Sequence, residues 1–120
     1  MLSSEEITQH PDLVAFWDFQ EPTGSVRVSK GPRPYGLRPH GGEIRRVEGG
    51  VFGSYAAYLA EGQWFSIPRT ELGDLNIHGP QAQVSVLAWI MRGRKSTSEC
   101  EAVAGIWDET RAKRQYCLFL

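Results

Sequence analysis

The longest apolar run of the chain is VSVLAWIM, residues 84–91, which ends at the charged Arg92. It is too short for a transmembrane helix, which needs about 20 consecutive apolar residues. An unbroken apolar run of this kind, with β-branched and aromatic residues, is typical of a strand that is buried on both faces. The pattern therefore predicts a central β-strand over 84–91.

Several shorter segments also combine apolar with β-branched or aromatic residues between turn signals. The predicted strands are LVAFWDF (13–19), SVRVSK (25–30), EIRRVE (43–48), QWFSIP (63–68) and a terminal hairpin, 101–107 with 114–120, around the polar loop DETRAK. SYAAYLAEG (54–62) fits a helix or a strand. The sequence thus predicts about eight short strands.

The remaining segments carry turn and loop signals. GPRPYGLRPHGG (31–42) contains three Pro and four Gly, and we expect an irregular loop there. TELGDLNIHGPQAQ (70–83) predicts a turn or a short 3₁₀ element. SSEE (3–6) can cap a short helical turn that ends at His10-Pro11. With many Gly and Pro breaks and no convincing amphipathic helix, the fold class is all-β, a sandwich or a barrel.

Length and charge narrow the function classes. A chain of 120 residues corresponds to one domain, with a polar leader over 1–12 and the domain over 13–120. The net charge is −1, so we expect no nucleic-acid and no membrane partner. The N-terminus has no signal-peptide pattern, which leaves the cytoplasm or a piece of a longer secreted chain as alternatives.

The two cysteines are Cys100 and Cys117. In the predicted hairpin Cys117 lies opposite Ala104, and Cys100 is then about 13 Å away, because a strand rises about 3.3 Å per residue. That distance is too long for a disulfide. We therefore expect free thiols, with Cys117 buried.

Three stretches in order resemble the laminin G-like domains of the concanavalin A-like lectin/glucanase superfamily. They are LVAFWDFQEPTG at 13–24, YAAYLAEGQWFSIPRTELGDLNIHGPQAQVSVLAWIMR at 55–92, and the terminal pair AVAGIW and QYCLFL. The resemblance implies a jelly-roll sandwich of two antiparallel sheets. Domains of this type continue with further strands, so it also implies that 13–120 is the N-terminal part of a domain. Self-association or a missing C-terminal half would complete it.

For function, the resemblance implies a non-catalytic carbohydrate-binding module of the concanavalin A-like lectin type. One alternative is a part of a glycoside hydrolase or lyase whose catalytic acids lie outside this chain. Another is a protein-interaction β-sandwich domain. The glucanases of this superfamily carry three acids in the motif Glu-x-Asp-x-x-Glu. In this chain Glu99 matches the first acid, Glu101 replaces the Asp, and Ala104 replaces the last Glu. We therefore expect no catalytic residue, and a solvated strand end instead.

The resemblance also raises calcium, which members of the family often hold near the loop after the first strand. Ca²⁺ takes six to eight oxygen ligands, and this chain offers Asp18, Glu21 and carbonyls. A turn and edge role for these two carboxylates is the alternative, and we expect no resident cofactor or metal. His10, His40 and His78 have no metal-ligand spacing and are expected on surface loops.

The densest group of candidate ligand-binding residues lies in the terminal hairpin. Sugar recognition combines aromatic faces with planar polar groups that bind hydroxyls. The segment around DETRAK supplies both, through Trp107, Asp108, Glu109, Arg114 and Tyr116. The alternative is a charged hairpin loop with Trp107 packed in the sandwich. The other three tryptophans lie within apolar strands and are expected in the core: Trp17, Trp64 and Trp89.

Overall fold

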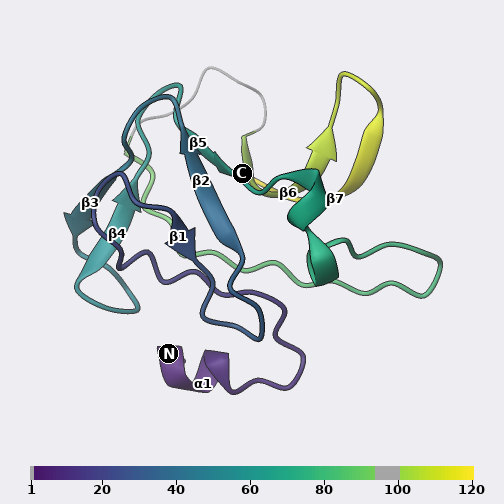
Figure 1. Ribbon diagram of the computed structural model, residues 1–120, viewed down its shortest axis with the longest axis horizontal. Helices are drawn as coiled ribbons and strands as arrows, with labels where there is room; N and C mark the ends of the chain where they lie inside the picture. Colours follow the sequence, from purple (N-terminus) through teal and green to yellow (C-terminus); the bar gives the residue numbers. More distant parts are fainter. Residues whose placement is uncertain (1, 94–100) are drawn as a thin grey trace. The chain divides into compact units, whose positions relative to one another are not determined.

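The computed structural model describes residues 2–93 and 101–120 (Figure 1). The chain divides into two compact units, residues 1–75 and 76–120, and each is described by itself. The described strands form antiparallel sheets and helix is almost absent, which confirms the all-β class. In the described segments no helix is long and apolar enough to cross a bilayer.

A short helix, α1 (Ser4–Thr8), opens the first unit. The Ser3 side chain accepts a hydrogen bond from the Glu6 N–H at 3.1 Å, which is the N-cap interaction that the sequence predicts. The Ser4 hydroxyl donates to the carbonyl of Phe52 at 3.1 Å and ties the helix to the unit.

The central sheet of this unit has the strand order β1-β2-β5. Its strands are β1 (Arg27–Val28), β2 (Gly36–His40) and β5 (Trp64–Ser66). In Figure 1, β2 lies between β1 and β5. The strands predicted over 25–30 and 63–68 are confirmed, although β1 is shorter than expected.

The loop predicted over 31–42 is wrong, because β2 lies within it. The first residues of β2 pair with β1, and Arg38, Pro39 and His40 pair with β5 only. Pro39 is therefore in the half of β2 that has one neighbour, where its missing N–H removes no ladder hydrogen bond on the open side. Counting Pro and Gly does not reveal this arrangement.

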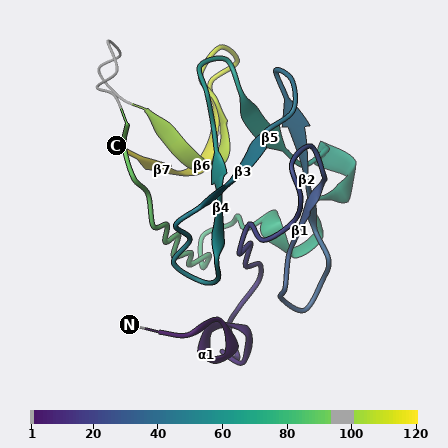
Figure 2. The same ribbon diagram turned by 90° about the vertical axis from the view of Figure 1, so that its left-hand side faces the viewer.

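The second sheet of the unit pairs β3 (Arg45–Glu48) with β4 (Tyr55–Tyr58), which Figure 2 shows side by side. The strand predicted over 43–48 is confirmed. For 54–62 the sequence allows a helix or a strand, and the structure has a strand there. The Arg45 guanidinium lies 4.9 Å from the ring centre of Tyr58, its cross-strand neighbour. Such cross-strand pairs stabilise a two-stranded sheet.

After β5 the chain makes two 3₁₀ turns, η1 (Arg69–Glu71) and η2 (Gly73–Leu75). The sequence predicts a turn or a short 3₁₀ element in this region, and that prediction is confirmed. Gly73 has a φ of +48°, a conformation that favours glycine. The two turns place Glu71 beside Arg38 of β2, and Asp74 beside Arg33 and Tyr35, which precede β2.

The most buried side chains of the first unit are Arg27, Ile44, Tyr35 and Ser29. Arg27 and Ile44 have no exposed surface. The guanidinium of Arg27 donates to the carbonyl of Ile44 at 2.8 Å and to that of Ser25 at 2.6 Å. The core is therefore built around a hydrogen-bonded arginine.

The strand predicted over 13–19 is wrong in the structure, where this segment joins no ladder among the described residues. Separate hydrogen bonds hold it instead. The Phe16 N–H donates to the Ser29 hydroxyl at 3.0 Å, and the Phe16 carbonyl accepts from the Lys30 N–H at 2.8 Å. Phe19 has a φ of +60°, which interrupts the extended backbone of a strand.

The central strand predicted over 84–91 is also wrong, because this segment forms no ladder with the described residues. A strand needs hydrogen bonds to a neighbouring strand, and apolar composition supplies no such neighbour. Its large side chains are exposed instead of buried, with 71% of Leu87 and 95% of Met91 accessible. Trp89, expected in the core, is exposed as well.

The second unit contains the predicted terminal hairpin, formed by β6 (Ala102–Asp108) and β7 (Lys113–Phe119). Trp107 lies opposite Arg114, as expected. Cys117 lies opposite Gly105 and not Ala104, because the register shifts between Ile106 and Trp107. Cys117, expected to be buried, is half-buried, and Cys100 lies outside the described residues.

Candidate functional site

Three of the predicted ligand residues meet around one carboxylate at the end of the β6–β7 hairpin. The Glu109 carboxylate accepts a hydrogen bond from the Trp107 indole N–H at 2.8 Å. It also accepts two from the Arg114 guanidinium, at 2.5 and 3.1 Å. These hydrogen bonds lower the pKa of Glu109, and those from Arg114 have the larger effect. The Arg114 guanidinium lies 5.8 Å from the ring centre of Trp107.

Asp108 organises the turn between the two strands. Its carboxylate accepts from the Thr110 hydroxyl at 2.6 Å and from the Arg111 guanidinium at 2.7 Å. These hydrogen bonds lower the pKa of Asp108 to about 2, from an ordinary value of 3.8. Asp108 therefore stabilises the turn as an anion, and its oxygens are largely engaged there.

Tyr116 is separated from the other predicted ligand residues. It lies opposite Ile106, whereas Arg114 lies opposite Trp107. Consecutive residues of a strand point to opposite faces, so Ile106 and Trp107 place these two pairs on different sides of the hairpin. Burial raises the pKa of the Tyr116 hydroxyl. The structure thus brings together Trp107, Asp108, Glu109 and Arg114, but not Tyr116.

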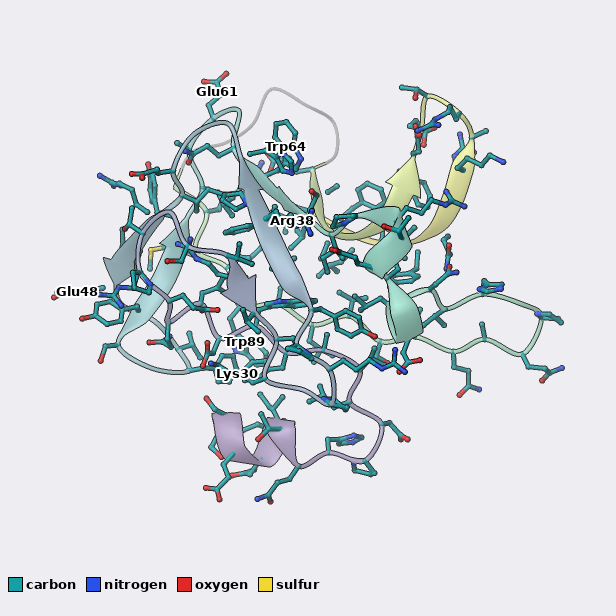
Figure 3. All side chains as sticks on the ribbon, viewed as in Figure 1. Lys30, Arg38, Glu48, Glu61, Trp64 and Trp89 are labelled. Atoms are coloured by element: carbon teal, nitrogen blue, oxygen red, sulfur yellow. The ribbon has the colours of Figure 1, made fainter. Side chains whose placement is uncertain are left out.

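A second group of polar and aromatic side chains lies on one face of the β2–β5 pair. Arg38 lies opposite Ser66, and His40 lies opposite Trp64. Alternate residues of a strand share a face, so these four side chains point to the same side. Figure 3 labels Trp64 and Arg38 over this pair of strands. We call this surface, together with Glu71 of η1, the Trp64 face.

The aromatic part of the Trp64 face is held by His40. The two rings are stacked, with centres 4.9 Å apart and planes 13° apart. His40 Nε2 lies 2.6 Å from the Ser66 hydroxyl, which fixes the imidazole. The Trp64 side chain nevertheless remains 55% exposed. Its expected place in the core is therefore wrong, and a large part of the indole faces solvent in a fixed orientation.

The charged part of the Trp64 face is an ion pair. Arg38 Nη2 lies 2.9 Å from both carboxylate oxygens of Glu71. Both side chains are about half exposed, so the pair offers donors and acceptors to solvent. Such an exposed pair contributes little to stability, typically less than about 1 kcal/mol. The pair matters for ligand binding because of where it lies, and not because it stabilises the fold.

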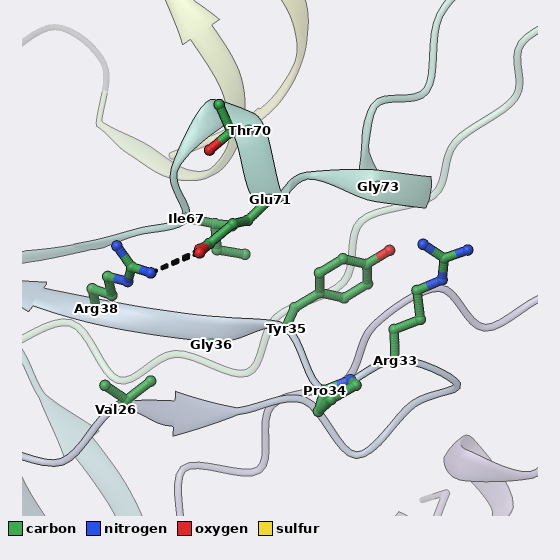
Figure 4. A pocket seen from close by; sticks show the side chains of 10 residues that line it. All are labelled: Val26, Arg33, Pro34, Tyr35, Gly36, Arg38, Ile67, Thr70, Glu71 and Gly73. Carbon is green, nitrogen blue, oxygen red and sulfur yellow. Dashed lines mark hydrogen bonds and ion pairs between the residues drawn. The ribbon is translucent and has the colours of Figure 1, made fainter.

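A pocket of about 590 Å³ adjoins the Trp64 face (Figure 4). Arg38 and Glu71 line it on one side, and Figure 4 shows Tyr35 between them and Arg33. The Arg33 Nε lies 3.2 Å from a carboxylate oxygen of Asp74. The volume lies within the range of about 300–1,000 Å³ that is usual for small-ligand sites. We call this cavity the Tyr35 pocket.

The sequence contains a signal for the Trp64 face that apolar content alone conceals. Trp64 and Ser66 alternate with Phe65, and Arg38 and His40 alternate with Pro39. Period-2 alternation is typical of strands with one solvent-facing side. Only the pairing of β2 with β5 shows that the two alternating segments share a face.

No group of three or more His, Cys, Asp or Glu side chains that could hold a metal ion occurs within 2–93 and 101–120. Asp18 accepts a hydrogen bond from the Gln20 N–H at 3.3 Å, and Glu21 accepts one from the Val28 N–H. Both carboxylates thus serve the local backbone. Glu101 pairs with Arg92 at 3.2 Å, whereas Glu99 lies outside the described residues.

The chain was compared with known protein families, curated proteins and solved structures. None of these comparisons finds a match.

Proposed function

We propose that this chain is a non-catalytic carbohydrate-binding module with a concanavalin A-like jelly-roll architecture, and that the Trp64 face is its sugar-binding surface. The observation that carries the proposal is the exposed indole of Trp64, held on His40 beside the Arg38–Glu71 pair. A pyranose has an apolar face that stacks on an aromatic ring and hydroxyls that both donate and accept.

Pre-organisation supports this surface over a loose aromatic residue. Stacking on His40 restricts the Trp64 ring, and the His40–Ser66 hydrogen bond restricts His40 in turn. A ligand then loses less free energy in ordering the site. The Arg38–Glu71 pair supplies N–H donors and carboxylate acceptors at the same face.

The terminal hairpin is the second candidate surface for the same function. Trp107 is 40% exposed there, next to Arg114 and Glu109. Its polar groups bind one another, so a ligand would have to displace the Glu109 interactions. For this reason the Trp64 face is the better-supported site. Arg114→Ala would weaken sugar binding only if the hairpin carried the site.

A glycan array with purified protein, followed by calorimetry on the sugars that bind, tests the proposal. Trp64→Ala should lower the affinity about tenfold or more, since stacking and its fixed geometry are lost. Trp107→Ala is the matched control, because it removes an exposed tryptophan from the other candidate surface. A loss of affinity from Trp107→Ala, with none from Trp64→Ala, would move the site to the hairpin. No binding of any glycan would contradict the proposal.

A protein-interaction domain is a second candidate function, because one observation favours it. The extended segment 84–91 exposes several large apolar side chains, among them Leu87 and Met91. Apolar segments of this kind are typical of interaction surfaces.

The hydrolase or lyase alternative would require sugar turnover by the whole protein. A reducing-sugar release assay on the glycans that bind separates turnover from binding.

A further inference from the structure

The Tyr35 pocket and the Trp64 face are continuous along β2. Arg38 belongs to the face and also lines the pocket, and Gly36, which lines the pocket as well, lies two residues earlier on the same strand. The distance along the strand from Gly36 to His40 is about 13 Å. That length exceeds one sugar ring and suits a short oligosaccharide.

The charges around the Tyr35 pocket are balanced. Arg38 is paired with Glu71, and Arg33 with Asp74, so each guanidinium has a carboxylate beside it. An anionic ligand would approach two carboxylates and would have to displace them from the arginines. A neutral hydroxyl can donate to a carboxylate oxygen and accept from a guanidinium N–H, so it uses both members of a pair.

Tyr35 is held rigidly at the floor of the pocket. Only 7% of its surface is exposed. Its carbonyl accepts from the Trp17 indole N–H at 3.0 Å and from the Ser29 N–H at 2.9 Å. Its hydroxyl accepts from the Asp74 N–H at 2.8 Å. In the part of the chain that the structure describes, no acceptor binds the hydroxyl proton, which leaves it for a ligand oxygen.

Gly73 keeps the space above Tyr35 open. A Cβ at this position would lie 2.9 Å from the Tyr35 hydroxyl oxygen and 3.0 Å from the Arg33 Nη1 atom. Any side chain there would therefore enter the pocket or push its polar groups aside. The combination of a fixed hydroxyl, two arginine–carboxylate pairs and free volume is that of a built site for a polar, uncharged group.

We infer that the Tyr35 pocket is a second subsite, which binds the next units of a neutral oligosaccharide whose first unit stacks on Trp64. This inference rests on the proposed function and adds the ligand's charge, its minimum length and its direction along β2. The inference predicts that neutral glycans bind more tightly than glycans rich in uronic acids or sulfates.

The first test measures affinity against ligand length with the whole chain. Neutral gluco-, manno-, galacto- and xylo-oligosaccharides, from the monosaccharide to the hexasaccharide, are titrated by calorimetry. Affinity should rise about tenfold between the monosaccharide and the trisaccharide. Thr70→Trp fills the pocket from the exposed η1 turn and should remove this rise. Arg69→Trp, an adjacent exposed residue that does not line the pocket, should keep it.

The second test concerns charge. Glu71→Gln should weaken the binding of neutral oligosaccharides about threefold to tenfold, because a carboxylate acceptor is lost. Oligogalacturonates should bind the unmodified protein more weakly than neutral chains of equal length. Tighter binding of oligogalacturonates, increased further by Glu71→Gln, would overturn the inference.

The outcomes separate this inference from the proposed function. If Trp64→Ala abolishes binding while Thr70→Trp leaves the length dependence intact, the second subsite is wrong and the Trp64 face stands. If only charged glycans bind, the inferred neutral subsite is wrong and the proposed function stands. If no glycan of any kind binds, both are wrong.

Discussion

The buried guanidinium of Arg27 lies 5.4 Å from the ring centre of Phe65. Arg27 has no exposed surface, and it belongs to β1 whereas Phe65 belongs to β5. These two strands do not pair with each other, since β2 separates them. The contact therefore links β1 to β5 beyond the ladder hydrogen bonds, on the side of the sheet opposite Trp64.

Arg27→Met should destabilise the protein by about 3 kcal/mol, because the carbonyls of Ile44 and Ser25 lose a buried charged donor. Chemical denaturation monitored by tryptophan fluorescence measures the change in the free energy of unfolding. Arg45→Met, at an exposed arginine that contacts Tyr58, is the control and should cost less than about 1 kcal/mol. Equal stability of the two variants would show that the Arg27 contacts are not structural.

Gly41→Ala should disrupt the connection that follows β2. Gly41 has a φ of +79°, and a Cβ there would lie 2.1 Å from the Gly62 carbonyl oxygen. Because the obstacle is backbone, the chain must shift, and we expect a loss of about 2–4 kcal/mol together with weaker glycan binding at the neighbouring Trp64 face.

Gly62→Ala is the matched control for that substitution. Gly62 also has a φ of +79°, but a Cβ there meets nothing within 4 Å. It should cost only the left-handed strain, about 1 kcal/mol. Thermal unfolding of the two variants side by side gives the difference, and equal losses would mean that the close approach to Gly62 does not exist.

The pKa of Asp108 sets a pH dependence for the terminal hairpin. Hydrogen bonds from Thr110 and Arg111 lower this pKa to about 2, below the ordinary 3.8. The lowered pKa means that the folded turn favours the carboxylate. Its stabilisation is complete above about pH 4 and is lost as the pH falls through about 2.

Carboxyl chemical shifts followed by NMR between neutral and strongly acidic pH measure this pKa directly. Thr110→Val should move the Asp108 pKa upward, because it removes the hydroxyl donor. Thr23→Val, at a threonine far along the chain from the hairpin, should leave it unchanged. A midpoint near 4 for Asp108 in the unmodified protein would contradict the hydrogen-bonded turn.

Self-association is expected through the exposed apolar segment 84–91. Leu87 is 71% and Met91 is 95% exposed, and covering such surface is favourable at roughly 25 cal/mol per Å². The double substitution Leu87→Asp and Met91→Asp should shift the protein toward the monomer in light scattering at increasing concentration. Leu2→Asp, at another exposed apolar residue, is the control. A strictly monomeric unmodified protein at all concentrations would refute this expectation.

The sequence by itself determines the parts of this protein that depend on local chemistry. Turn residues and short apolar runs identify the all-β class, the strands around Arg45 and Trp64, the 3₁₀ turns and the terminal hairpin with Trp107 opposite Arg114. These features rest on backbone preferences and on neighbours within a few residues, which a single segment contains.

Tertiary structure decided the features that depend on partners distant in the chain. It placed β2 inside a segment rich in Pro and Gly, and it left 84–91 without a ladder, because a strand exists only where a neighbour supplies hydrogen bonds. It exposed Trp64 on a shared face with Arg38, and it separated Tyr116 from Trp107 through a one-residue register shift. Apolar content predicts burial on average, but only pairing and register decide which side of a strand meets the solvent.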